Sequence, residues 1–132
     1  MARLRGAGAI LLGKTNTPEL TMAYETDNLV YGRTNNPYDQ SCTCGGSSGG
    51  AAAILATGGA ALDVGSDTGA SIRVPSHFLR GIAGIKPTAG LIPKTGHILP
   101  LGGIVGAMTQ LGPMVRQVED LALALPILAA LT

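Results

Sequence analysis

Apolar and polar positions along the chain follow the periods expected of strands and helices. Near the N-terminus, Ala9–Leu12 is an unbroken apolar run of strand length that stops at Gly13, which predicts a strand. Near the C-terminus, apolar residues recur at helical spacing and predict an amphipathic helix kinked near Pro126. These residues are Val118, Leu121, Ala122, Leu125, Leu128 and Ala129.

The middle of the chain predicts two further strands and two further helices. The strands are Ala61–Gly65 and Ile82–Ile85, both short segments of strand length. The helices are Ser48–Thr57, an alanine-rich segment closed by Gly58-Gly59, and Ser71–Leu79. Strands that alternate with helices predict an α/β fold, and 132 residues fit a single domain.

Two segments outside these elements carry signals of their own. Thr17-Pro18-Glu19 has the order of a helix start: a capping threonine, a proline in the first position and an acidic residue at the positive end of the dipole. Thr26–Cys44 is rich in Asn, Thr, Tyr, Gly and Pro and predicts a long irregular loop. Ordered loops of this length are usually functional.

Composition narrows the classes of function. The net charge is +1, 13% of residues are charged and no basic run is present, so nucleic acid and membranes are not expected as partners. The apolar stretches Ala51–Leu62 and Leu121–Leu131 are too short to cross a bilayer. Cys42 and Cys44 are expected to be reduced thiols of a cytoplasmic protein, and no metal or cofactor motif is present.

Two glycine-containing stretches match short functional patterns. Gly8–Thr15 matches the phosphate-loop pattern G-x-x-x-x-G-K-[ST], but its central residues favour a strand and no helix follows at once, so nucleotide binding is a minor alternative. Gly45–Gly50, GGSSGG, satisfies the G-x-S-x-G pattern of a nucleophile elbow, but loop-like residues precede it and only His77 and His97 could complete a triad. Its composition also fits a flexible linker, although it runs directly into a predicted helix.

Asp67–Pro75, DTGASIRVP, places a serine at the end of a turn of small residues. Because Ser71 precedes a predicted helix, the backbone N–H groups of Thr68 to Ser71 could converge on an anion. A hydroxyl among inward-pointing N–H groups has the geometry of a nucleophile beside its own oxyanion hole. Ser71 as an ordinary helix cap is the alternative that these residues leave open.

Read together, Gly45–Gly50, Asp67–Pro75 and Gly84–Thr88 resemble the amidase signature family of serine hydrolases. The spacing from Ser47 to Ser71 fits the pattern of that family, and the resemblance covers nearly the whole chain. It implies an amidase-signature-like α/β fold, here truncated, with a mixed β-sheet core flanked by helices. The flanking segments that agree with the family are Leu12–Asn16, Asn36–Asp39 and Gly112–Arg116.

The resemblance also implies roles for individual residues. Ser71 is expected to be the nucleophile that forms an acyl-enzyme with a small-molecule amide or ester, and Ser47 the bridging serine, at a cis peptide bond, that relays a proton. Ser48 is expected to be a supporting hydroxyl. Asp67 and Arg73 are expected to be an ion pair that braces the turn, with a solvated surface pair as the alternative. The expected oxyanion hole consists of the backbone N–H groups of Thr68, Gly69, Ala70 and Ser71.

The chain departs from the family pattern at several positions. The general base of the family is a lysine upstream of the region that matches Leu11–Asn16, and the chain is expected to begin too late to contain it. Ala70 stands where the family usually has glycine, and Cys44 where it often has proline. A catalytically inactive fragment that associates with copies of itself is therefore the second hypothesis, because unpaired strand edges would stay exposed. The remaining lysines, which match other family positions, are Lys14, Lys86 and Lys94.

Overall fold

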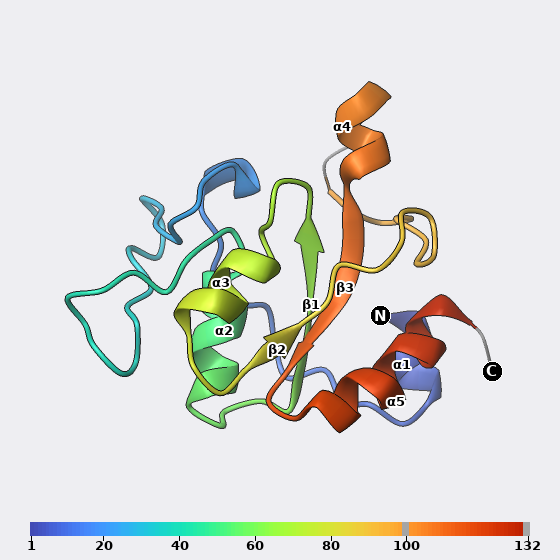
Figure 1. The fold of residues 1–132 in the computed structure, drawn as a ribbon, viewed down its shortest axis with the longest axis horizontal. Coiled ribbons are helices and arrows are strands. Elements are labelled where there is room, and N and C mark those ends of the chain that lie inside the picture. Colours follow the sequence, from blue (N-terminus) through green and yellow to red (C-terminus); the bar gives the residue numbers. More distant parts are fainter. Residues whose placement is uncertain (99–100, 131–132) are drawn as a thin grey trace.

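The computed structural model describes residues 1–98 and 101–130, and its centre is a three-stranded β-sheet. The strands are β1 (Leu62–Asp67), β2 (Ala83–Gly84) and β3 (Gln110–Val115), and they lie in the order β1-β3-β2 (Figure 1). β3 is antiparallel to both of its neighbours. β1 and β2 confirm the strands predicted at 61–65 and 82–85, with bounds shifted by one or two residues.

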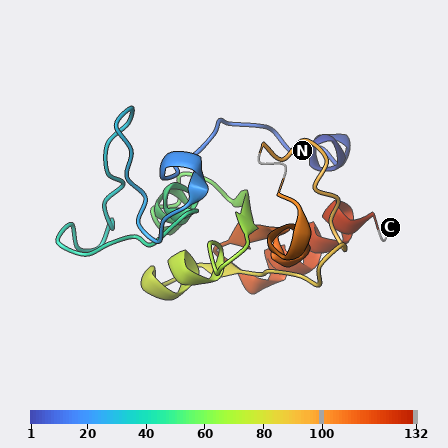
Figure 2. The ribbon, with the colours of Figure 1, turned by 90° about the horizontal axis from the view of Figure 1, so that it is seen from above.

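Helices cover both faces of this sheet, which confirms the α/β class. α2 (Gly49–Ala56) and α3 (Arg73–Phe78) pack on one face, whereas α5 (Val118–Ala129) packs on the other with α1 (Ala2–Gly6) beside it (Figure 1, Figure 2). The helices predicted at 48–57, at 71–79 and near the C-terminus are confirmed. Pro126 lies inside α5, and Leu131, the end of the apolar stretch noted above, is outside the described residues.

Two apolar clusters fill the layers on either side of the sheet. Because side chains alternate along a strand, Leu62 and Val64 of β1 pack against the cluster around Leu128, whereas Gly65 faces Ser48 and Ile72. The opposite cluster anchors both α2 and α3 to the sheet, and with them the loops that lead into these helices. Its buried members are Cys44, Ala51, Ala52, Leu55, Ala56, Ile72, Leu79 and Met114.

The central strand, β3, is not predicted from the sequence because Gly112-Pro113 has the appearance of a turn. In the structure, Pro113 lies opposite Val64 of β1, and its carbonyl oxygen accepts the N–H of Ile85 at 3.2 Å. A Cβ atom on Gly112 would lie 2.0 Å from the carbonyl oxygen of Ile85. Gly112 therefore lets the residue that follows β2 approach this closely, and Pro113 supplies the carbonyl oxygen that pairs with it.

The strand predicted at 9–12 is wrong. No strand forms there, and Ile10 and Leu12 expose 83% and 75% of their surface. An apolar run becomes a strand only where a neighbouring strand satisfies its backbone hydrogen-bonding groups, and none of the described strands pairs with it.

The helix start predicted at 17–19 is also wrong in detail. The chain forms a single 3₁₀ turn, Glu19–Thr21, and the residue before it is Pro18, with no side-chain cap. The turn cannot continue as a helix because Leu20 and Thr21 adopt φ angles of 51° and 58°. The irregular loop predicted at 26–44 is confirmed, and its described backbone contains one isolated bridge, between Asn35 and Thr43.

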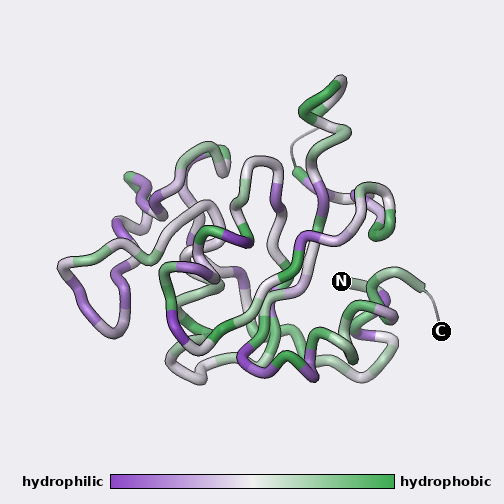
Figure 3. Tube along the Cα trace, in the orientation of Figure 1, coloured by the Kyte–Doolittle hydropathy of each residue, from purple (hydrophilic) through white to green (hydrophobic). Residues whose placement is uncertain are grey.

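Two short helices, α1 and α4 (Gly103–Met108), are not predicted from the sequence. α4 projects away from the sheet just before β3 (Figure 1), and Figure 3 shows that this projecting helix is largely apolar. Its Ile104 is 76% exposed and its Met108 51%. Among the residues that the structure describes, no helix combines the length and the apolar character needed to cross a membrane.

Candidate active site

The Gly45–Gly50 loop is buried and closely packed. The peptide bond between Gly46 and Ser47 is cis, as the resemblance implied for the bridging serine. A Cβ atom on Gly46 would lie 2.7 Å from the carbonyl oxygen of Ala23, which is shorter than any ordinary carbon contact. The loop therefore needs glycine for close approach to the backbone beside it, and it is not a flexible tether.

Thr26 contacts this loop on both sides of Ser47, and its side chain is buried. Its hydroxyl donates to the carbonyl oxygen of Gly45 at 2.9 Å and accepts the N–H of Gly49 at 3.0 Å. In the sequence, Thr26 is only the first residue of a predicted irregular loop. No spacing or motif marks it, because both partners are remote in sequence.

The carboxylate of Asp67, at the end of β1, organises the second turn. It is fully buried, and its oxygens accept the N–H of Ala70 at 2.8 Å and that of Ile72 at 3.1 Å. The backbone N–H of Arg73 and two guanidinium N–H groups of the same residue complete five hydrogen bonds. Burial by itself raises the pKa of the Asp67 carboxyl, but the Arg73 guanidinium and the backbone N–H groups outweigh burial and hold that pKa below its usual value. The carboxylate therefore stays charged and fixes residues 67–73 as one unit.

The ion pair between Asp67 and Arg73 has one buried end and one exposed end. Nη2 of Arg73 lies 2.9 Å from Oδ1 of Asp67, and the side chains of Arg73 and Asp67 are 54% and 0% exposed, respectively. The hydrogen bonds to Asp67 raise the pKa of Arg73. Because the carboxylate is excluded from water and also holds backbone N–H groups, the pair braces the turn rather than being a solvated surface pair.

Ala70 has a backbone conformation that favours glycine, with φ at +90°. Alanine thus replaces the glycine of the family pattern at a position whose φ angle is unfavourable for a residue with a Cβ atom. Its N–H donates to Asp67 and is not a free donor for the predicted oxyanion hole. Among the described residues, the N–H groups of Thr68, Gly69 and Ser71 donate to no protein acceptor, so three of the four predicted donors are free.

A backbone hydrogen bond joins the two turns. The N–H of Ser48, the residue that precedes α2, donates to the carbonyl oxygen of Ser71 at 3.2 Å. Ser47 and Ser48 are buried, whereas Ser71 is partly exposed. Tyr24, which lies in none of the predicted motifs, donates its hydroxyl to the carbonyl oxygen of Gly69 at 2.8 Å. The structure thus joins the two turns through the backbones of Ser48 and Ser71.

The lysines that the structure describes make no hydrogen bond to Ser47 or Ser71. Nζ of Lys94 donates to the carbonyl oxygen of Gly106. Within the described part of the chain, no lysine makes a hydrogen bond to Ser47 or Ser71, so none is assigned as the base. Lys14 and Lys94 are exposed, and Lys86 is half-buried.

The two competing motif interpretations do not fit the structure. Gly8–Thr15 follows helix α1 instead of a strand, and it continues without regular structure instead of as a helix. Gly45–Gly50 follows an irregular loop, whereas a nucleophile elbow requires a strand before it. His77 is exposed and lies edge-on to the ring of Phe78. Neither phosphate-loop nor elbow geometry is present at these positions.

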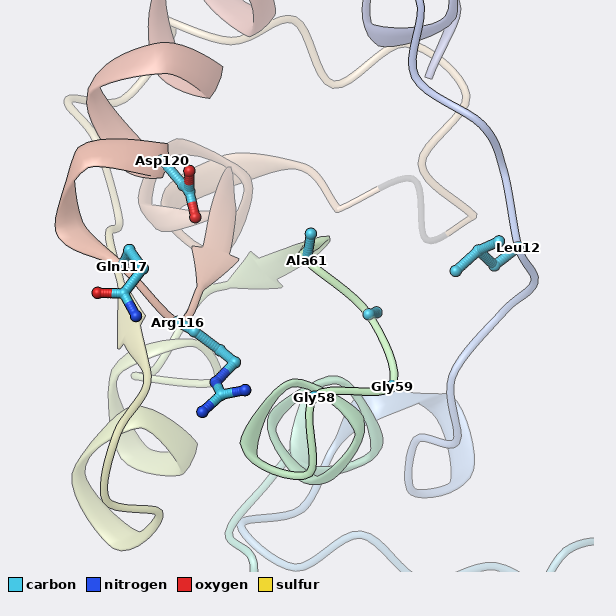
Figure 4. Close-up of a pocket in the computed structure, with 8 residues that line it drawn as sticks. Leu12, Gly58, Gly59, Ala61, Arg116, Gln117 and Asp120 are labelled. Atoms are coloured by element: carbon cyan, nitrogen blue, oxygen red, sulfur yellow. The ribbon is translucent and has the colours of Figure 1, made fainter.

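An open hollow of about 490 Å³ lies where α2 ends and α5 begins. Figure 4 shows Arg116, Gln117 and Asp120 on one side of it and Leu12 on the other, with Gly58 and Gly59 between them. None of Ser47, Ser48 and Ser71 lines it. The hollow is therefore separate from the candidate active site.

The chain thus combines an α/β fold with two adjoining serine-bearing turns. One turn is a buried glycine-rich loop, and the other is held by a buried carboxylate. The family model described as amidase matches residues 1–131, and the chain belongs to the amidase signature family. The family predicted from the motifs is thereby confirmed.

Known relatives agree with this assignment. The chain is 48% identical over 129 residues to fatty-acid amide hydrolase 2 of Homo sapiens, an alignment that covers 98% of this chain and 24% of that protein. It is 45% identical over 122 residues to vitamin D3 hydroxylase-associated protein of Gallus gallus, covering 92% of this chain and 26% of the relative. The chain thus spans about a quarter of the length of these curated relatives.

Solved structures show the same fold. The crystal structure of an amidase superposes with a TM-score of 0.89 at 40% identity, over 98% of this chain and 29% of that one. The structure of 6-aminohexanoate cyclic dimer hydrolase superposes with a TM-score of 0.85 at 35% identity, over 96% of this chain and 26% of that one. The predicted amidase-signature-like fold is therefore confirmed.

Proposed function

We propose that the chain carries the nucleophilic half of an amidase site, in which Ser71 attacks carboxylic amides and Ser47 relays the proton. The single observation that carries this proposal is the hydrogen bond from the N–H of Ser48 to the carbonyl oxygen of Ser71, because it holds the two serine-bearing turns together. The free N–H groups of Thr68, Gly69 and Ser71 supply donors beside that nucleophile. Removing one such donor typically slows an enzyme about 10²–10³-fold.

In the proposed reaction, Oγ of Ser71 forms a bond to the carbonyl carbon while the carbonyl π electrons move to oxygen, where the free N–H groups stabilise the negative charge. The proton of Ser71 passes through the hydroxyl of Ser47 to the leaving nitrogen, and the C–N bond then breaks. Water attacks the carbonyl carbon of the resulting ester, and one of its protons passes through the Ser47 hydroxyl to Oγ of Ser71. The carbonyl double bond then re-forms as the C–O bond to Ser71 breaks. The products are a carboxylic acid and an amine, and no cofactor is needed.

Proton transfer from Ser71 requires a general base, and the resemblance assigns that role to a lysine upstream of Leu11–Asn16 in the family. No lysine that the structure describes makes a hydrogen bond to either serine. We therefore expect weak amide hydrolysis by this chain alone. Esters are the better substrates for it, because their leaving group demands less of acid–base catalysis.

A serine-directed fluorophosphonate tests the proposed nucleophile. The expected result is one covalent adduct that peptide mass spectrometry locates on Ser71, that is absent in Ser71→Ala and that forms more slowly in Ser47→Ala. Labelling that persists unchanged in Ser71→Ala would place the nucleophile elsewhere and overturn the proposal.

A specific observation also favours self-association as a second candidate property. Leu29, Val30 and Tyr31 are exposed by 102%, 78% and 80%, and they follow one another in the chain. Large exposed apolar side chains in groups are typical of surfaces that pack against another protein surface. Light scattering at several concentrations tests this candidate: a mass that rises with concentration supports it, and a constant monomer mass contradicts it.

A further inference from the structure

The Ser47 loop is held from outside by one side chain that belongs to neither turn. Thr26 is 1% exposed, and its hydroxyl donates its single proton to the carbonyl oxygen of Gly45 at 2.9 Å. Oγ1 of Thr26 in turn accepts the N–H of Gly49 at 3.0 Å. One hydroxyl group therefore bridges the two ends of the segment that carries Ser47.

The fit around this hydroxyl is tight enough to be specific. A Cβ atom on Gly49 would lie 2.3 Å from Oγ1 of Thr26 and 2.9 Å from its Cβ. The carbonyl oxygen of Ser47 is 3.5 Å from the same Oγ1, at the limit of a hydrogen bond. The backbone of Thr26 is fixed in turn, since its carbonyl oxygen accepts the N–H of Thr34 at 2.8 Å. A rigid residue thus meets a loop that has glycine where the contact is closest.

We propose that Thr26 is a positioning residue for the bridging serine: its hydroxyl sets the separation of Gly45 and Gly49 and thereby the place of the Ser47 side chain relative to Ser71. This inference rests on the proposed function, because Ser47 must meet Ser71 to relay a proton. Thr26 touches neither the reacting atoms nor the substrate. Its effect passes through the backbone of the loop.

The decisive comparison is between two substitutions at this position. Thr26→Val keeps the shape of the side chain and removes both hydrogen bonds, whereas Thr26→Ser keeps the hydroxyl and removes only a methyl group. A misplacement of about 1 Å costs up to about 100-fold in rate. We expect fluorophosphonate labelling of Ser71 to slow at least about tenfold in Thr26→Val and less than about threefold in Thr26→Ser.

A third variant separates positioning from general stability. Leu128→Ala removes buried apolar volume on the opposite face of the sheet and touches neither serine turn. If it slows labelling as much as Thr26→Val does, when each is measured well below its own melting temperature, Thr26 has no positioning role. Equal labelling rates for Thr26→Val and the unmodified chain overturn the inference as well.

Amide hydrogen exchange gives a readout that does not depend on catalysis. Because the N–H of Gly49 donates to Oγ1 of Thr26, its exchange is expected to accelerate at least about tenfold in Thr26→Val and to stay near the parent rate in Thr26→Ser. If the unmodified chain shows no label on Ser71, the proposed function fails while this measurement still judges the inference. An unchanged Gly49 exchange rate in Thr26→Val would then contradict it.

Discussion

Gly45–Gly50 and Gly8–Thr15 both combine glycines with hydroxyl groups, but only Gly45–Gly50 is packed against the rest of the protein. In Gly45–Gly50, a Cβ atom on Gly49 or Gly50 would come within 2.3–2.5 Å of another residue. In Gly8–Thr15, a Cβ atom on Gly8 or Gly13 would meet nothing within 4 Å. The first stretch adjoins the Asp67 turn, whereas the second is an exposed segment without regular structure.

The difference shows that a short pattern acquires meaning from what surrounds it. Gly8–Thr15 matches its phosphate-loop pattern at every defined position, yet it lacks the strand and helix that the pattern needs. GGSSGG matches a linker and an elbow equally well, and its packing excludes the former while the loop before it excludes the latter. Substitutions in the packed turns are therefore expected to have larger effects than substitutions in the exposed segment.

Asp67→Asn is expected to lower the free energy of unfolding by about 3 kcal/mol, because a buried charged acceptor loses its guanidinium pairing and several N–H groups lose a strong acceptor. Urea unfolding followed by circular dichroism measures the change. Glu19→Gln, at an exposed carboxylate, is the matched control and is expected to stay within about 0.5 kcal/mol of the parent. Equal effects of the two variants would show that the hydrogen bonds of Asp67 add no more to the free energy of unfolding than an exposed carboxylate does.

The same carboxylate predicts a pH dependence. Its folded-state pKa is lowered, so its contribution is fully present above the unfolded pKa of about 3.9 and is lost as the pH falls through the folded value. The free energy of unfolding is therefore expected to decrease on acidification below about pH 4. Asp67→Asn should show a smaller decrease over the same range, and an identical acid limb in both proteins would contradict this assignment.

Gly50→Ala tests the packed glycine stretch. Helix propensity alone would stabilise the first turn of α2 by up to about 1 kcal/mol. Because a Cβ atom would lie 2.5 Å from the backbone nitrogen of Asn16, we expect instead a loss of about 2 kcal/mol in unfolding free energy. Gly13→Ala, which meets nothing within 4 Å, should change it by less than about 0.5 kcal/mol. A stabilised Gly50→Ala variant would mean that the loop has room to relax.

Ala70→Gly is the one change expected to stabilise the chain. At φ +90° an alanine is strained and a glycine is not, so the free energy of unfolding should rise by about 1 kcal/mol. The larger unfolded-state entropy of glycine opposes this gain but does not cancel it. Thermal unfolding of the two proteins at one protein concentration measures the difference, and a lower melting temperature for Ala70→Gly would contradict the strained conformation.

Nucleotide is expected to have no effect. A ligand that binds the folded state raises its stability, and the exposed Gly8–Thr15 segment offers no phosphate cradle. Addition of ATP with magnesium should leave the melting temperature unchanged, with and without Lys14→Ala. A rise that disappears in Lys14→Ala would restore the phosphate-loop interpretation.

Local sequence signals predict the parts of the fold whose causes are local. The alanine-rich α2, the short α3 and the periodic α5 follow from propensity and spacing, as do β1 and β2. β3 is not predicted, because its Gly112-Pro113 pair forms a strand only through pairing with β1 and β2 on either side. The run at 9–12 fails for the opposite reason: its pattern is that of a strand, but it has no partner among the described strands.

The candidate site likewise contains residues that a local motif predicts and residues that only contacts remote in sequence bring to it. Ser47, Ser71 and the Asp67–Arg73 pair lie in contiguous motifs, so a resemblance was sufficient to find them. Thr26 and Tyr24 act across some twenty to forty-five positions through single hydroxyl groups, and no local pattern encodes such contacts. The positive φ of Ala70 occurs where its N–H donates to the carboxylate of Asp67, three residues earlier.

Capture of the acyl-enzyme tests the proposed site most directly. The chain is mixed with an activated aryl ester, quenched in acid within seconds, and digested for mass spectrometry. The expected result is an acyl adduct on the peptide that carries Ser71, absent in Ser71→Ala and slower to form in Ser47→Ala. An adduct that maps to any other residue, or that forms equally fast without the Ser47 hydroxyl, would contradict the pairing of these two serines.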